Sequence, residues 1–550
     1  MYNHAITMEE VSMKRRPNII IFNPDQMRAD SMGHLGNRAA ITPFLDEFAR
    51  TEGVSFRNAF CQNPVCVPSR CSFTTGLYPH VHGHRTMSYL LREGESSVFK
   101  ELKDSGYYVW MNARNDLVAG QIPGLLEEHA SEIYYGGEAS APPGTEKDLR
   151  GEPGSKHYYS MFGGRLLLDK EGRNYGSDDE DLDAAIARIR NLPENQPLCL
   201  FLGLQNPHPP YQVEEPYYSA VDRKKMKPRI RPENGKGKPR IEMLIHQKQG
   251  LTDYSEEDWN ELRACYLGMC MKVDTMFEKL CHALKEAGEY DNSAIFFFSD
   301  HGDYTGDYGL SEKAQNTFED CLMNVPFLIK PPRGDAADPG ISDAMVELVD
   351  FYATAMDYAD VKPDHSQYGK SLRNAVGNRN VEIRDFVCAE GGRLEDEVHC
   401  DEFHANGPNG TPLFYPYWPR HSAQSDPEAH AKGYMIRTKY WKYIARINEE
   451  DEFYDLIHDP EELINQADNP SVKQEKEALR NQLMMWLMRT SDVVPYDYDK
   501  RFSPEMTWAK VKRYVPKGYE EEIRQKISGG ANHFALIEEC KRRFQSDERN

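Results

Sequence analysis

The hydrophobic pattern of roughly the first 300 residues predicts buried strands that alternate with amphipathic helices. Four runs of consecutive apolar residues have the length and continuity of strands covered on both faces. These runs lie at 17–22, 107–112, 197–204 and 293–299. Apolar residues at helical spacing predict helices at 42–56, 97–105, 181–192 and 254–288. In the first of these, Thr42 is the expected N-cap and Gly53 the expected stop. This order of elements predicts an α/β fold.

The pattern changes near residue 381. Residues 433–445 and 451–459 alternate between apolar and polar positions, as antiparallel strands do, and a helix is expected at 471–489. The last fifty residues have the pattern of amphipathic helices. We expect this helical extension either to pack back on the preceding subdomain or to form a homo-oligomeric interface. The predicted segments are a tail at 1–16, a large domain at 17–380, a subdomain at 381–495 and the extension at 496–550.

Composition excludes some classes of protein. No stretch of the 550 residues approaches the roughly 18 apolar residues that a membrane span needs. The first residues are polar and lack the apolar core of a signal peptide, so the sequence as given predicts a cytoplasmic protein without a membrane partner. The 11 cysteines are irregularly spaced and include no Cys-x-x-Cys pair, which favours reduced thiols over a disulfide framework.

The net charge of −22 argues against a nucleic-acid partner. It also means that an anionic substrate has to be bound by a local group of cations, because the overall field repels it.

The most informative segment is Cys66-Val67-Pro68-Ser69-Arg70. It follows a turn at Asn63-Pro64 and starts a run that reads as a helix ending near Gly76. A thiol at a helix N-terminus, with Arg70 nearby, is expected in an electropositive position that favours the thiolate. The alternative is a buried structural cysteine beside a surface arginine.

This Cys-x-Pro-Ser-Arg segment, followed by Thr-Gly, resembles the signature of the formylglycine-dependent sulfatases, in the alkaline-phosphatase superfamily. The resemblance implies that a formylglycine-generating maturation enzyme oxidises Cys66, and that the hydrated aldehyde is the nucleophile. It implies a large mixed central sheet flanked by helices in a catalytic domain at 17–380. It also implies a smaller C-terminal α+β subdomain with a four-stranded antiparallel sheet.

Two strand ends carry candidate metal ligands. Asp25 and Gln26 follow the first predicted strand, and Asp300 and His301 follow the fourth. Side chains at the carboxyl ends of strands lie where open α/β sheets bind ligands, although Asp25 could instead cap the next turn. The resemblance makes these four residues, together with Cys66, the metal site. Calcium is the usual ion of the family, and the Gln26 amide and the His301 ring leave Mg²⁺ or Mn²⁺ open.

The resemblance also assigns residues that bind substrate or move protons. Arg70, Arg114 and Lys313 are expected to stabilise the charge on the sulfate oxygens. Lys313, in a Gly-Asp-x-Gly context, is expected to face the departing group. His208, held between prolines after a strand, is expected to contact substrate or to act in acid–base chemistry, unless it is only a turn residue. Where the family has Gly-Lys-x-His, this chain has Ala113-Arg114-Asn115-Asp116, so Arg114 can replace the lysine but Asp116 cannot replace the histidine.

Three histidines, His80, His82 and His84, alternate just after the Cys66 segment. Their spacing is compatible with metal binding, but the flanking turn residues favour a solvated loop, from which one histidine could reach the site.

These features together predict a sulfatase that acts on a small anionic substrate, such as a sulfated carbohydrate or an aryl sulfate. A phosphonate monoester or phosphodiester hydrolase of the same superfamily is the main alternative, because those enzymes share the Asp-Gln pair. A phosphatase or mutase with an unmodified nucleophile and a binding protein that has lost catalysis are the others. The loops at 120–180, 221–250 and 388–430 are expected to select the substrate.

Overall fold

The computed structural model describes most of the chain, and its described part divides into two compact units. The larger unit is Met1–Pro363 with Gln367–Val493, and the smaller is Asp364–Ser366 with Val494–Asn550. The predicted tail lies outside the described residues except for Arg16. The described ranges are 16–120, 122–136, 151–153, 155–166, 175–232, 235–397, 413–494 and 502–544.

An eight-stranded mixed sheet forms the centre of the larger unit and confirms the predicted fold class. Its spatial order is β10-β2-β9-β8-β1-β6-β3-β4. Strand β9 runs antiparallel to both of its neighbours, and the other pairs are parallel. The strands are β1 (Asn18–Asn23), β2 (Val54–Phe60), β3 (Tyr108–Asn112), β4 (Glu132–Tyr134), β6 (Leu198–Gly203), β8 (Ser293–Phe298), β9 (Phe327–Lys330) and β10 (Gly340–Glu347).

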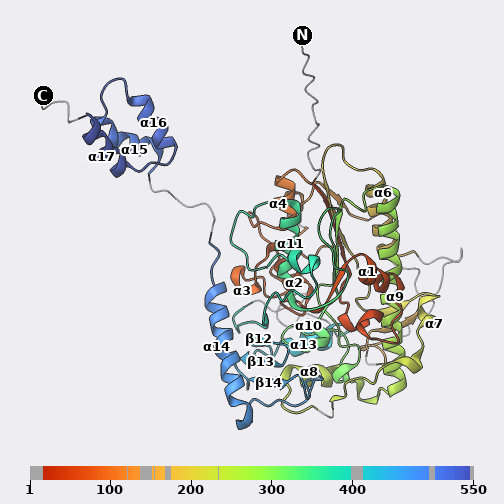
Figure 1. Ribbon diagram of the computed structural model, residues 1–550. Coiled ribbons are helices and arrows are strands. Elements are labelled where there is room, and N and C mark those ends of the chain that lie inside the picture. The colour runs from red at the N-terminus through yellow and green to blue at the C-terminus, as the bar shows by residue number, and fades with distance from the viewer. Residues whose placement is uncertain are drawn as a thin grey trace. The chain divides into compact units, whose positions relative to one another are not determined.

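Helices cover both faces of this sheet (Figure 1). Side chains alternate along β1, so that Ile19 and Ile21 pack on one face while Ile20 and Phe22 pack on the other. The first face is covered by α2 (Cys66–Thr75), α4 (Val98–Asp104) and α11 (Val349–Ala359), and the second by α1 (Pro43–Thr51), α6 (Ser177–Arg190) and α9 (Glu256–Glu286). Burial on both faces explains why the strands read as continuous apolar runs.

The predicted helix at 42–56 was too long. Helix α1 ends at Thr51, and Val54–Phe60 is strand β2. At Gly53 the chain passes so close to β9 that a Cβ atom would lie 2.7 Å from the Ile329 carbonyl oxygen. Residues after it pair with β10 on one side and β9 on the other, and this pairing overrides the helical spacing seen in the sequence.

A second, four-stranded antiparallel sheet lies in the same unit, in the order β11-β12-β13-β14. Helix α14 (Lys473–Thr490) packs on it through Leu479, Leu483 and Trp486, which share a core with Ile436 and Phe453. The strands are β11 (Val387–Gly391), β12 (Gly433–Arg437), β13 (Trp441–Arg446) and β14 (Glu452–Asp455).

The described part of the smaller unit contains three α-helices with a core of their own. They are α15 (Pro504–Val511), α16 (Glu520–Ser528) and α17 (His533–Phe544). Val511, Ile523 and Leu536 are among the residues buried between them. The role of this extension in oligomerisation stays a prediction.

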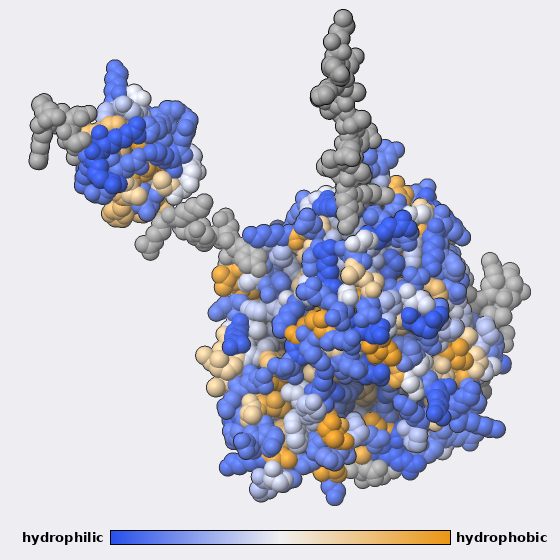
Figure 2. Space-filling view, in the orientation of Figure 1, coloured by the Kyte–Doolittle hydropathy of each residue, from blue (hydrophilic) through white to orange (hydrophobic). Residues whose placement is uncertain are grey.

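The surface agrees with the acidic, polar composition. Figure 2 shows a largely hydrophilic face on the larger unit, with hydrophobic patches of limited extent. Among the described residues, no helix combines the length and apolar character needed to cross a bilayer.

The turn after β8 tolerates only glycine at position 302. A Cβ atom there would lie 2.0 Å from the Cys321 carbonyl oxygen, whereas the same atom at Gly120 would meet nothing within 4 Å. We expect Gly302→Ala to lower the free energy of unfolding by about 1–3 kcal/mol, because the backbone at Gly302 or at Cys321 has to move to make room for the Cβ atom. Gly120→Ala is the matched control and should change it by less than about 0.5 kcal/mol. Urea denaturation of both variants measures this, and equal stability would contradict the close packing of this turn.

Candidate active site

The carboxyl ends of four parallel strands meet at one edge of the central sheet. Strand β1 leads to Asp25, β8 to Asp300, β6 to His208 and β3 to Arg114. Helix α2 begins at the same place with Cys66. Ligand sites in open α/β sheets form at this edge, because the loops that leave the strands converge there.

The Cys66 side chain is the centre of the cluster. Its Sγ lies 3.2 Å from His301 Nε2, 3.7 Å from both carboxylate oxygens of Asp25 and 3.3 Å from Lys313 Nζ. Burial, reinforced by the Asp25 charge, raises the pKa of the Cys66 thiol well above its ordinary value of 9.0. The expectation of a stabilised thiolate was therefore wrong, because desolvation outweighs the helix N-terminus and the cations.

The residues around Cys66 fit a divalent cation. Asp25, Cys66, Asp300 and His301 each offer one donor atom, and these atoms lie within 4.8 Å of one another. His301 Nδ1 donates to the Gly302 carbonyl oxygen at 2.9 Å, so its Nε2 carries the lone pair that faces the cluster. Burial would raise the pKa of Asp25, but the nearby cations hold it well below its ordinary value of 3.8, so this carboxylate is ionised.

The Gln26 amide is oriented by hydrogen bonds on both sides. Its Nε2 donates to Asp303 Oδ2 at 2.6 Å, and its Oε1 accepts from Lys313 Nζ at 2.8 Å. Asp303 also accepts from Tyr211 OH at 2.8 and 2.9 Å and from the Thr305 backbone N–H at 2.6 Å. Burial raises the pKa of Asp303 to about 7, and above that pH its carboxylate can only accept. The amide oxygen therefore faces the cluster, as a metal ligand requires.

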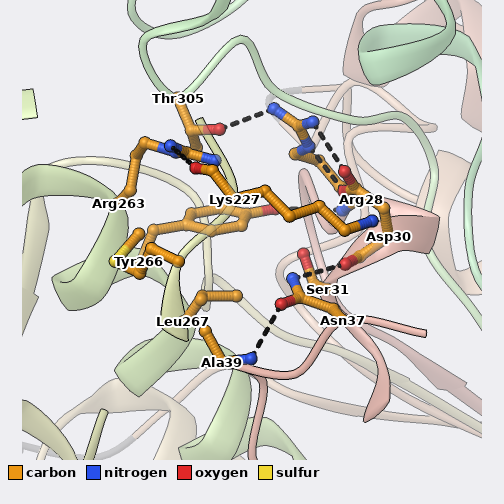
Figure 3. Close-up of a pocket in the computed structure, with 11 residues that line it drawn as sticks. Arg28, Asp30, Ser31, Asn37, Ala39, Lys227, Arg263, Tyr266, Leu267 and Thr305 are labelled. Carbon is orange, nitrogen blue, oxygen red and sulfur yellow. Dashed lines mark hydrogen bonds and ion pairs between the residues drawn. The ribbon is translucent and has the colours of Figure 1, made fainter. Parts of the chain in front are cut away.

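Arg28 fixes the chain segment that carries Asp303. Its Nη1 donates to the Thr305 hydroxyl at 2.7 Å and to the Asp303 carbonyl oxygen at 3.2 Å. Figure 3 shows this guanidinium between Thr305 and Asp30, beside Tyr266. The Tyr266 hydroxyl in turn accepts from Arg28 N–H at 2.9 Å and donates to the Gln26 carbonyl oxygen at 2.8 Å. Arg28, Thr305 and Tyr266, which support the candidate ligands, are thus among the residues that line the pocket of Figure 3.

Arg70 connects the two carboxylates of the cluster. Its Nε donates to Asp300 Oδ2 and its Nη2 to Asp25 Oδ2, both at 2.9 Å, and the side chain has no exposed area. Its Nη1 donates to the Asn115 carbonyl oxygen at 3.3 Å. With its nitrogens engaged in this way, Arg70 orients the ligand carboxylates more directly than it could contact a substrate.

Two further cations are placed to meet an anion. Arg114 donates to Asp25 Oδ2 at 2.9 Å, and 30% of its side chain is exposed, so it lies on the open side of the cluster. Burial would lower the pKa of Lys313, but nearby acidic groups, the carboxylates of Glu312 and Asp25 among them, raise it above its ordinary value of 10.5, so the amine keeps its proton. Burial would also lower the pKa of Arg114, but the charges of Asp25 and then Asp116 raise it. The backbone of Asp116 has a φ of 45°, in the left-handed region.

His208 is also brought to this edge. Its Nδ1 donates to the Pro209 carbonyl oxygen at 2.7 Å. Burial and the charges of Lys313 and Arg114 lower its pKa well below the ordinary value of 6.5. The ring is therefore neutral at pH 7, and its Nε2 can accept a proton.

The three alternating histidines do not form one cluster, since His80 has different partners from His82 and His84. Pro79–His82 forms a short helix, α3, in place of the expected loop. His80 bonds to Glu390 and to the Thr490 carbonyl oxygen, at 2.7 and 2.9 Å, while His82 and His84 lie against Glu95.

Sequence reasoning missed three residues of this site. Asp303 accepts from Gln26, Tyr211 donates to Asp303, and Arg420 contacts Glu312, the neighbour of Lys313, at 3.1 Å. Asp303 has a sequence signal, since it lies two residues after His301 in the same turn. Tyr211 and Arg420 have none, because their place depends on long-range packing.

Fold and site together define an α/β protein with a candidate metal-binding cluster around a buried cysteine. The family model described as Sulfatase matches residues 17–361, well over half of the chain. The chain therefore belongs to the sulfatase family, which places it among the sulfuric ester hydrolases.

Individual relatives agree with this family. Arylsulfatase K of Xenopus laevis is 25% identical over 467 residues, covering 77% of this chain and 74% of that protein. An arylsulfatase of Clostridium perfringens is 24% identical over 510 residues, covering 85% and 94%. Among solved structures, the phosphonate monoester hydrolase of Agrobacterium radiobacter has a TM-score of 0.67 at 21% identity, covering 88% of this chain and 100% of that one. A protein titled a 2-O GAG sulfatase has a TM-score of 0.63 at 19% identity, covering 88% and 96%.

The orientation of Gln26 can be tested by exchanging donor and acceptor. Asp303→Asn should keep an oxygen for Thr305 and Tyr211 and direct its NH₂ at Gln26, so that the Gln26 amide turns its own NH₂ toward the metal position. We expect divalent-cation affinity to fall about 10- to 100-fold. Asp303→Asn combined with Gln26→Glu should restore most of it, because a carboxylate at position 26 accepts from the new amide and still presents an oxygen.

Calorimetric titration of Mn²⁺ into the three proteins measures these affinities. Wild-type affinity in the Asp303→Asn protein, or no recovery in the double variant, would contradict the orienting role.

Proposed function

We propose that this sulfatase hydrolyses the sulfate ester of a sulfated carbohydrate or an aryl sulfate, using a formylglycine made from Cys66 and a divalent cation. The observation that carries the proposal is the convergence of Asp25, Asp300 and His301 on the Cys66 side chain, with Lys313 beside it. The names of the relatives Arylsulfatase K and Arylsulfatase support this substrate class. A maturation enzyme would be the partner that oxidises Cys66.

The two groups that the chain does not encode would supply complementary chemistry. A divalent cation, held by Asp25, Gln26, Asp300 and His301, would supply positive charge that polarises the sulfate oxygens and lowers the pKa of the nucleophile. Formylglycine at position 66 would supply a hydrated aldehyde, with one hydroxyl to attack sulfur and a second whose deprotonation lets sulfate leave. The donor set of oxygens with one nitrogen suits Ca²⁺, Mg²⁺ or Mn²⁺.

The chain's own residues provide orientation, charge and proton transfer. Arg70 holds Asp25 and Asp300 in place. Arg114, the more exposed cation, is placed for the sulfate oxygens, and Lys313, which keeps its proton, for the oxygen of the leaving alcohol. Asp116 limits the net charge on the Arg114 side and would orient that cation. The neutral ring of His208 is the base that the scheme needs for the second hydroxyl, where family members carry the histidine that Asp116 replaces here.

A phosphonate monoester or phosphodiester hydrolase is the second candidate. It is favoured by one feature, the neutral amide of Gln26 in the ligand set, held with its oxygen toward the cluster by Asp303. The two candidates differ in the charge and geometry of the anion that Arg114 and Lys313 have to bind.

The nucleophile and the substrate class are tested in one comparison. Protein co-expressed with a formylglycine-generating enzyme should release sulfate from an aryl sulfate faster than it cleaves an aryl phosphonate monoester. Cys66→Ala should reduce the sulfatase rate by at least about 10³-fold, because no nucleophile remains, while thermal unfolding shows an intact fold. Faster phosphonate cleavage would select the second candidate, and an active Cys66→Ala protein would exclude the covalent scheme.

The pH dependence tests the role of His208. Its base form persists as pH falls below 6.5 and is lost only when pH passes its lowered pKa. We therefore expect the acidic limb of kcat, caused by His208, to lie below pH 6.5. His208→Ala should lower kcat about 10²-fold or more and remove this limb. A limb that survives the substitution would assign the base to another residue.

A further inference from the structure

A second group of metal-binding side chains lies outside the active site. His82 ends α3, His84 follows the Gly83 turn, and Glu95 lies before α4. One donor atom from each lies within 4.8 Å of the others. The Cys66 cluster is at the opposite end of α2, the helix that precedes α3, so the two groups are separate.

Each histidine of this group lies close to one oxygen of the Glu95 carboxylate. Glu95 Oε2 lies 3.2 Å from His84 Nε2, and Glu95 Oε1 lies 3.6 Å from His82 Nδ1. Ligands about 2.0–2.1 Å from a tetrahedral zinc ion are about 3.3 Å apart, so each contact is near ligand separation, although the two contacts use different oxygens. The rings of His82 and His84 are inclined at 69°, with centroids 6.2 Å apart, so they approach the same region from different directions.

The ring of His84 is oriented as a ligand. Its Nδ1 bonds to the Tyr89 carbonyl oxygen at 2.9 Å, and a carbonyl only accepts, so this nitrogen carries a proton. The Nε2 atom is buried and has no hydrogen bond to any described atom, although Glu95 is 3.2 Å away. A backbone carbonyl on one ring nitrogen, with the other ring nitrogen facing a carboxylate, is an arrangement that metal-binding histidines show.

We propose that His82, His84 and Glu95 bind a zinc-type divalent ion, with a fourth position open to water. Two imidazoles and one carboxylate are a ligand set that suits zinc, and three protein ligands leave the fourth position free. Access is through His82, whose side chain is 34% exposed, whereas His84 and Glu95 are 5% and 14% exposed. The ion would link α3 to the segment before α4. Because α3 follows α2, the helix that begins at Cys66, the ion would also fix the C-terminal end of α2.

Arg92 is the competitor for Glu95. Its Nη2 lies 2.6 Å from Glu95 Oε1, and its backbone N–H donates to Oε2 at 2.7 Å. The Arg92 side chain is 65% exposed, so it can leave the carboxylate at little cost when an ion arrives. Without an ion, Glu95 would form only its contacts with Arg92 and His84.

The test is a zinc titration of the full-length chain after treatment with a chelator. Wild-type protein should bind one more equivalent of Zn²⁺ than His82→Ala or Glu95→Gln, with the active-site equivalent unchanged in all three. His80→Ala is the matched control and should keep the additional equivalent, since His80 bonds to Glu390 and Thr490 instead. Loss of a supporting hydrogen bond weakens metal affinity roughly 10- to 100-fold. Loss of a ligand, in His82→Ala or Glu95→Gln, should weaken zinc affinity by more than that.

Cobalt absorption gives a second readout that does not depend on hydrolysis. Co²⁺ at a four-coordinate site with two imidazoles should give visible bands that are present in wild-type and His80→Ala protein and lost in His82→Ala. Equal melting temperatures without metal would show that the variants fold. Arg92→Ala should leave zinc affinity unchanged or a few-fold higher. Identical zinc stoichiometry and affinity in wild-type and His82→Ala protein would overturn the proposal and leave an ion pair only.

Discussion

The active site depends on one buried ion-pair network, in which the Arg70 guanidinium joins Asp25 and Asp300. The two carboxylates follow different strands, β1 and β8, and their like charges would repel each other without a cation between them. Removing one partner of a buried ion pair typically costs about 3–5 kcal/mol, since the remaining charge is left desolvated. The network thus fixes the two carboxylates, and the two strand ends that carry them, relative to each other. It also explains why the arginine of the Cys66 segment is fully buried.

A second layer of hydrogen bonds determines which atoms face the cluster. The Gly302 carbonyl selects the tautomer of His301, and Asp303 selects the orientation of the Gln26 amide. Arg28 and Tyr266 then hold the backbone on either side of these groups. Because amide and imidazole groups offer a donor and an acceptor on different atoms of one planar group, their orientation decides whether they bind a cation or repel it. The chemistry of the site therefore depends on residues that contact neither substrate nor metal.

Electrostatics separate this site from the rest of the molecule. The chain has a net charge of −22, yet two cations face the cluster at this edge of the sheet, Lys313 buried and Arg114 partly exposed. At a buried position a cation acts on an anion much more strongly than on the open surface. Burial also raises the pKa of Cys66 and lowers that of His208, so the thiol and the imidazole are both neutral.

The sequence by itself determined the family, the α/β class and the strand ends that carry Asp25, Asp300 and His301, because buried strands and short motifs depend on neighbouring residues. It also predicted the four-stranded antiparallel sheet. Only the tertiary structure decided the end of α1 at Thr51, since β2 is defined by its pairing with β9 and β10, far away in the sequence. It alone showed the raised pKa of Cys66, the amide orientation of Gln26 and the approach of His82 and His84 to Glu95. Desolvation and hydrogen-bond direction arise from groups that the fold brings together, and no local pattern encodes them.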